Sequence, residues 1–205
     1  MKRIIWVIGV VILLSSCQPT PTSNPKSTVE PLFPSLPDFS GAYSITIIDN
    51  WGGLAPAAPI NSLYIIENPT DHVDDTQFQG AALFSVGGYF ADVKKETAQI
   101  NVPKDVVKAF LQKLSQASPT NGTYEPFFEH TDDYPEITIR VLYGNAETIE
   151  FFTRSQGDEH SPWKVTYNGN SYVVKSGIPM QALEIIRPYL AQDELEKLAE
   201  QIQVK

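Results

Sequence analysis

Two series of short segments in which apolar and polar residues alternate constrain the fold of this chain more than any other feature. The first series comprises residues 42–49, 61–68, 80–93 and 97–102. The second comprises residues 136–144, 146–155, 162–169 and 171–177. Alternation over about 4–8 residues, with many β-branched and aromatic side chains, is typical of strands that bury one face. Each series therefore predicts a group of short strands, with a glycine break inside 80–93.

A segment with helical periodicity follows each series. In residues 102–116, Pro103 stands where a first helical residue is expected, and apolar residues recur at helical spacing after it. These apolar residues are Val106, Val107, Phe110, Leu111 and Leu114. Residues 179–190 predict a second helix that Pro188 interrupts, and residues 193–203 predict a short third helix.

This order of segments predicts an α+β fold. We expect a mostly antiparallel sheet with two main helices, two similar halves that each run from strands to a helix, and a short C-terminal helix. Asn168-Gly169 is a strong signal for a hairpin within the second half, and Gly144-Asn145 predicts another turn there. Residues 39–205 are enough for a single domain with a substantial core.

The first sixteen residues are typical of a secretory signal peptide. Lys2 and Arg3 precede an uninterrupted apolar run over residues 4–14, and two small serines follow it. A helix that spans a bilayer needs roughly 20 apolar residues, so this run favours a cleaved signal over a permanent transmembrane segment.

The sequence Leu14-Ser15-Ser16-Cys17 resembles the lipobox of bacterial membrane-anchored lipoproteins. The resemblance implies that the Cys17 thiol receives a diacylglycerol, that cleavage follows just before Cys17, and that a further acyl chain such as palmitate is added to the new amino terminus. Gln18 stands where an aspartate would imply retention at the inner membrane, so the resemblance implies an outer-membrane destination in a host that has one. The alternative is an ordinary secretory signal with an incidental cysteine. The specific resemblance covers residues 1–17, and the rest of the chain is similar only to envelope lipoproteins of uncharacterised role.

Residues 17–38 have the composition of a tether. Six prolines lie between Gln18 and Pro37, among Thr, Ser and Asn residues. Such a segment favours extended polyproline II structure, and twenty residues at about 3 Å each reach on the order of 60 Å. The predicted organisation is a signal peptide over 1–16, a lipidated cysteine and tether over 17–38, and one domain over 39–205.

The chain is acidic and has a single cysteine. The formal charge is −9, and removal of Lys2 and Arg3 with the signal peptide makes it −11. This charge argues against binding to nucleic acid and favours cations, basic partners or neutral ligands, although it also serves solubility alone. One cysteine excludes an internal disulfide framework and a paired-cysteine metal site.

Two tracts share the pattern acid-His-x-Asp-Asp. Their candidate metal-ligating residues are His72, Asp74, Asp75, His130, Asp132 and Asp133. Carboxylates with an imidazole would suit a divalent cation or acid/base chemistry. Both tracts also lie between predicted elements, where acidic residues are common because the backbone turns there. The spacing matches no established metal motif, so we predict no cofactor and keep a divalent cation only as the weaker alternative.

Trp51 and Trp163 are candidates for ligand binding. Trp51 lies in a glycine-rich turn, and Trp163 begins the late hairpin. Exposed indole rings stack on sugars or grip peptides. Trp163, Val165 and Tyr167 nevertheless share one face of their strand by alternation, which favours the core for these three.

Taken together, these features predict an extracytoplasmic domain attached to a bacterial membrane through its N-terminal lipid. We expect a non-catalytic module that binds an envelope protein, a peptide or a glycan. The alternative is an envelope hydrolase that uses residues of the acid-histidine tracts.

Overall fold

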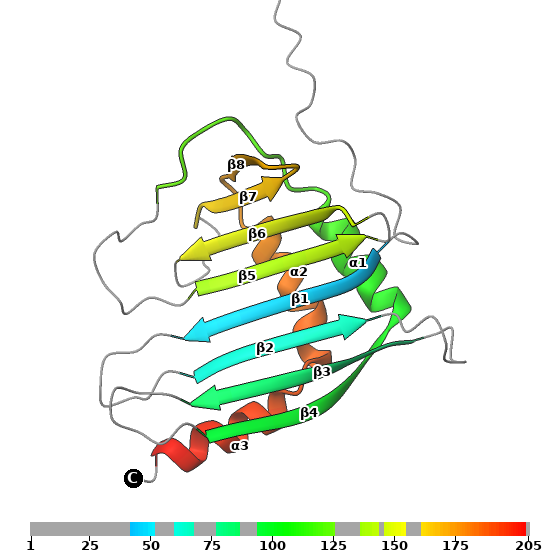
Figure 1. Cartoon of the computed structure of the whole chain (residues 1–205), viewed down its shortest axis with the longest axis vertical. Coiled ribbons are helices and arrows are strands. Elements are labelled where there is room, and N and C mark those ends of the chain that lie inside the picture. Colours follow the sequence, from blue (N-terminus) through cyan, green and yellow to red (C-terminus); the bar gives the residue numbers. More distant parts are fainter. Residues whose placement is uncertain are drawn as a thin grey trace, which may run out of the picture. The chain divides into compact units, whose positions relative to one another are not determined.

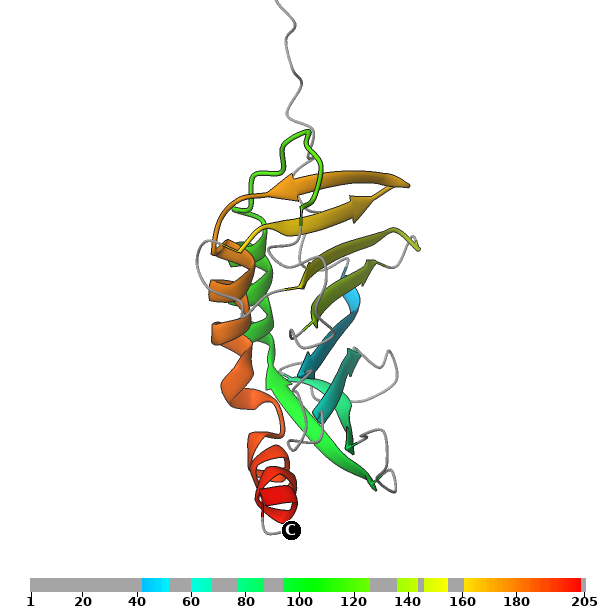
Figure 2. The same cartoon turned by 90° about the vertical axis from the view of Figure 1, so that its left-hand side faces the viewer.

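Eight antiparallel strands form one sheet, and two helices pack side by side on one of its faces (Figures 1 and 2). The arrangement comes from a computed structural model that describes residues 42–51, 60–67, 77–86, 94–125, 136–143, 146–154 and 161–203. All of these residues belong to one compact unit that extends from Pro31 to Lys205.

The chain passes through two successive halves of the same plan. The first half contains β1 (Ala42–Trp51), β2 (Ile60–Glu67), β3 (Gln77–Val86), β4 (Lys94–Pro103) and α1 (Lys104–Leu114). The second half contains β5 (Glu136–Tyr143), β6 (Thr148–Arg154), β7 (Trp163–Tyr167), β8 (Asn170–Val174) and α2 (Ile178–Ile186). A 3-10 turn, η2 (Arg187–Tyr189), and a C-terminal helix, α3 (Gln192–Gln203), follow. The predicted α+β fold, with two strands-then-helix halves and a C-terminal helix, is confirmed.

The two halves meet at the centre of the sheet. The strand order is β4-β3-β2-β1-β5-β6-β7-β8, so each half is a simple meander, and β1 pairs with β5. Ile47 lies opposite Ile139 in this central pair, and both side chains are buried. The first strand of each half is thus an inner strand of the complete sheet.

The core lies between the sheet and the helices. Buried side chains alternate along the strands, as in β6, where Ile149, Phe151 and Thr153 are buried and their neighbours are not. Phe110 of α1 and Ile186 of α2 close the core from the helix side. Every core residue in the described part of the chain lies between Ala42 and Leu198, within the unit that extends from Pro31 onward.

Local signals in the sequence explain several boundaries. Asn168 and Gly169 have positive φ angles of 48° and 75°, as a tight two-residue hairpin requires, and the predicted hairpin of β7 and β8 is confirmed. Pro188 lies in η2, where the second helix ends as predicted. Pro103 is the N-cap of α1 and the last residue of β4, so the helix begins one residue later than expected. Its ψ of 142° continues the strand conformation. The predicted turn at 144–145 lies outside the described residues.

Candidate functional site

The face of the sheet that points away from α1 and α2 is the candidate site. Figure 1 looks onto this face with the two helices behind it, and Figure 2 shows both helices on the other side. We call it the open face, and it carries the strand side chains that alternate with the buried ones. In the segment between α1 and β5, Thr120 pairs with β8 at the edge of the sheet, and the Tyr124 side chain contacts Phe152 on this face.

A row of apolar side chains crosses the open face at one register level. Leu83 of β3 lies opposite Leu63 of β2, and Leu63 lies opposite Ile48 of β1. Thr138 of β5 continues the row from Ile48 to Phe152 of β6. We call Leu83, Leu63, Ile48, Thr138 and Phe152 the apolar row. It spans four strand spacings of about 4.8 Å, or roughly 19 Å.

The apolar row departs from the usual composition of such a surface. The solvated face of an antiparallel sheet normally presents polar side chains. Leu83 is instead 40% exposed, and the other three apolar members of the row are partly exposed. Ile65, one register level away on β2, is partly exposed as well and extends the apolar surface. A contiguous apolar surface of this kind is characteristic of a site of interaction.

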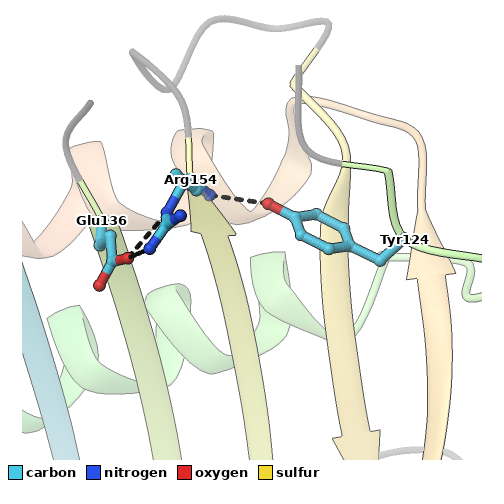
Figure 3. Close-up of polar contacts among 3 residues, drawn as sticks. All are labelled: Tyr124, Glu136 and Arg154. Atoms are coloured by element: carbon cyan, nitrogen blue, oxygen red, sulfur yellow. Dashed lines mark hydrogen bonds and ion pairs between the residues drawn. The ribbon is translucent and has the colours of Figure 1, made fainter. Parts of the chain in front are cut away.

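Two cross-strand ion pairs lie next to the apolar row, on β5 and β6. Nε and Nη2 of Arg140 donate to Oε2 of Glu150 at 3.0 and 2.6 Å. Arg154 pairs in the same way with Glu136, with its Nε 2.8 Å from Oε1 (Figure 3). The charges of these four side chains are therefore matched within the face, and each guanidinium makes two contacts with one carboxylate oxygen.

Tyr124 bounds the apolar row at its β6 end. Its ring packs edge-on against Phe152, with the ring centroids 5.9 Å apart. Its hydroxyl oxygen accepts a hydrogen bond of 2.8 Å from the backbone N–H of Arg154 (Figure 3). Thr120, four residues before Tyr124, exchanges two backbone hydrogen bonds with Val173 of β8 and so fixes the same segment at the sheet edge. This end of the open face is thus already occupied by the chain itself.

The helix-covered side contains a polar cluster that links β1 to η2. Asp49 Oδ2 lies 4.0 Å from Arg187 Nη2. Burial raises the pKa of Asp49 above its ordinary value, and Arg187 opposes that rise. Tyr64 hydrogen-bonds Ser62 and Gln192, and burial raises its pKa. These contacts hold η2 and the start of α3 against the sheet, which is a structural role.

Two hollows in the described surface are shallow. One, of about 290 Å³, lies between β4 and the segment from Pro188 to Glu194. The other, of about 420 Å³, lies beside the β7–β8 hairpin and is lined by residues such as Glu150, Thr166 and Asn168. Small-molecule sites usually enclose most of the surface of their ligand, and neither hollow is deep enough to do so.

The structure places only part of the predicted site. The candidate metal ligands His72, Asp74, Asp75, His130, Asp132 and Asp133 lie outside the described residues, as does Cys17. Trp51 ends β1, and its side chain is likewise outside the description. Trp163 is fully buried in the core, which is the placement that the alternation of its strand favoured.

The apolar row was missed by sequence reasoning, although the sequence contains a signal for it. The adjacent pairs Ile47-Ile48, Ile65-Ile66 and Phe151-Phe152 each put one apolar side chain on either face of a strand. A second apolar face follows from such pairs. Their alignment into one row depends on the register of strands that are far apart in the sequence.

No family model, curated protein or solved structure matches this chain. The described residues contain no group of three or more His, Cys, Asp or Glu side chains placed to hold a metal ion. None of the described helices is both long enough and apolar enough to cross a bilayer.

Proposed function

We propose that this chain is a lipid-anchored, extracytoplasmic binding module that holds a protein partner on the open face of its sheet and catalyses no reaction. The observation that carries the proposal is the apolar row on a face where polar residues are the rule. The N-terminal signal, the lipobox-like sequence and the proline-rich tether support the membrane anchor.

The shape of the face favours a protein over a small ligand. Sugars and metabolites are bound in concave sites that enclose most of their surface. The apolar row instead runs across several neighbouring strands, with matched ion pairs beside it. An apolar centre with polar surroundings is the usual plan of a protein–protein interface.

The test of this binding role is site-specific photo-crosslinking in the intact cell envelope. A photoreactive phenylalanine analogue at Leu83 should form an adduct of defined mass, because Leu83 lies in the apolar row. The same analogue at Gln112, which is exposed on α1 behind the sheet, is the matched control and should form none. Equal adducts from both positions, or none from Leu83, would contradict the proposal.

Replacement of the lipidated cysteine tests the anchor separately. We expect Cys17→Ser to incorporate no palmitate and to keep its signal peptide, because serine cannot form the thioether that precedes cleavage. One acyl chain holds a protein only marginally, whereas two or three hold it firmly. Ser16→Ala keeps a small residue before the cysteine and should behave like the wild type. A Cys17→Ser chain that still incorporates palmitate would rule out Cys17 as the point of lipid attachment.

A further inference from the structure

We propose that the partner on the open face is a second copy of this chain, so that two domains meet face to face through their apolar rows. The inference rests on the proposed function and names the occupant of the same surface. It follows from the charge of the face, its apolar content, its area and the anchoring of the chain.

The open face differs in charge from the rest of the molecule. Its described strand residues include four basic and three acidic side chains: Lys95, Arg140, Arg154, Lys164, Glu67, Glu136 and Glu150. The face therefore has a formal charge of +1, and the remainder of the full chain has −10. Two copies would repel each other through most other surfaces, whereas this face brings them together without a large net charge.

The ion pairs of the face allow it to be covered. A buried charge that lacks a partner is strongly destabilising. Arg140 and Glu150 neutralise each other within one copy, and Arg154 and Glu136 do the same. A second copy can therefore lie over these side chains without supplying a charge of its own.

A twofold arrangement matches apolar surface with apolar surface. In a twofold dimer the same surface is used by both copies, so the interface must be complementary to itself. If the twofold axis passes through the apolar row, the row of one copy lies against the row of the other copy. Two sheets pack face to face about 10 Å apart, with the side chains of their inner faces interdigitating. The side chains of Leu83 and Leu63 would then be buried away from water in both copies.

The area of the face is large enough for a stable dimer. The strands from β4 to β5, which leave out β6 and its contact with Tyr124, present five strand widths and four register levels of outward side chains. At about 4.8 Å for each strand and about 6.8 Å for each level, this footprint is roughly 24 by 27 Å, or about 650 Å². Specific stable interfaces bury about 600–1,000 Å² on each partner, and this footprint lies within that range.

Anchoring in one membrane would favour the pairing. The tether that the sequence predicts over residues 17–38 would allow two lipid-anchored domains to turn toward each other, at a reach of roughly 3 Å for each residue. Confinement of both copies to one membrane surface would raise their local concentration above that in dilute solution. A dimer that is weak in dilute solution would therefore be populated on the membrane.

Sedimentation equilibrium of the chain from Pro31 onward tests the inference. This unit contains the whole core of the described residues and lacks the only cysteine of the sequence, so disulfide exchange cannot link two copies. We expect a reversible dimer at concentrations up to about 1 mM. Leu83→Lys should raise the dissociation constant about tenfold or more, because it puts two like charges into an apolar interface. Gln112→Lys adds the same charge behind the sheet and should leave the dissociation constant unchanged.

A second variant distinguishes loss of the dimer interface from misfolding of the Leu83→Lys chain. Thr138→Lys puts a charge into the middle of the apolar row without removing an apolar side chain, and it should weaken the dimer as Leu83→Lys does. Circular dichroism of both variants should match the wild type. A wild-type chain that stays monomeric at about 1 mM would overturn the inference, and so would a dimer that both lysine variants leave intact.

The crosslinking experiment separates failure of this inference from failure of the proposed function. An adduct from Leu83 with twice the mass of the chain agrees with a second copy. An adduct of another mass, together with a monomeric chain in solution, would show that the partner is not a second copy. The proposed binding role of the open face would still hold. Absence of any adduct from Leu83 overturns both.

Discussion

Gly80→Ala is expected to lower the free energy of unfolding by about 3 kcal/mol, at the upper end of what overpacking usually costs. Gly80 lies within β3, opposite Ile66 of β2 and Ile100 of β4. A Cβ atom at this position would lie 2.1 Å from the carbonyl oxygen of Ile65 and 2.9 Å from the Cα atom of Ile66. Both are main-chain atoms of a paired strand, so no side-chain rotation can relieve the clash. Urea unfolding followed by circular dichroism measures the loss.

Gly122→Ala is the matched control for this substitution. A Cβ atom at Gly122 would meet Val173 Cγ2 at 3.7 Å, which is an ordinary contact. We expect its free energy of unfolding to lie within about 0.5 kcal/mol of the wild type. If Gly80→Ala were as stable as Gly122→Ala, the close approach of β2 and β3 at Gly80 would be wrong.

Trp163→Ala should lower the free energy of unfolding by as much as Gly80→Ala or more. Among the described residues, Trp163 on β7 is the largest fully buried side chain. Removal of a buried tryptophan costs about 3–5 kcal/mol, because apolar contacts are lost and a cavity remains. In the chain from Pro31 onward, Trp51 and Trp163 are the two tryptophans, so the same variant also reports on fluorescence. We expect it to lose the blue-shifted part of the emission.

Trp163→Phe separates packing from hydrogen bonding at this position. The indole Nε1 is buried without a hydrogen-bond partner among the described residues. Phenylalanine removes this unsatisfied donor and keeps much of the apolar volume, so we expect a loss within about 1.5 kcal/mol. If the Trp163→Ala chain were as stable as the wild type, Trp163 would not be a core residue, and ligand binding by its side chain would again be a candidate role.

The fold was accessible from the sequence because its signals are local. Alternation in segments such as 136–144 depends on one strand and one buried face, and the apolar spacing of α1 depends on one helix. Asn168-Gly169 specified its hairpin through backbone conformation alone. The exact start of α1 was harder to predict, because Pro103 suits either the end of a strand or the start of a helix.

The candidate site could not be predicted from local sequence signals in the same way. Ile48, Leu63 and Leu83 become neighbours only because β1, β2 and β3 pair in one register. The prediction concentrated instead on residue types with distinctive chemistry, such as histidine and tryptophan. A surface built from leucine, isoleucine and phenylalanine has no such marker, since the same residues form the core.

The order of strands also determines where an interaction surface can form. Because β1 and β5 meet at the centre of the sheet, the helices of both halves lie on one side of it (Figure 2). The other side has the ion pairs Arg140–Glu150 and Arg154–Glu136 next to the apolar row. The two halves together thus supply one surface that neither half could supply alone.

The most direct test of the account is hydroxyl-radical footprinting of the full chain in its native envelope membranes. The reference is the dilute chain from Pro31 onward. Leu83 and Leu63 should be labelled several-fold less in the envelope than in the reference, because a partner covers the open face. Tyr189, which is 41% exposed in η2, should be labelled equally in both. Equal labelling of Leu83 in the two preparations would contradict the binding role of the open face.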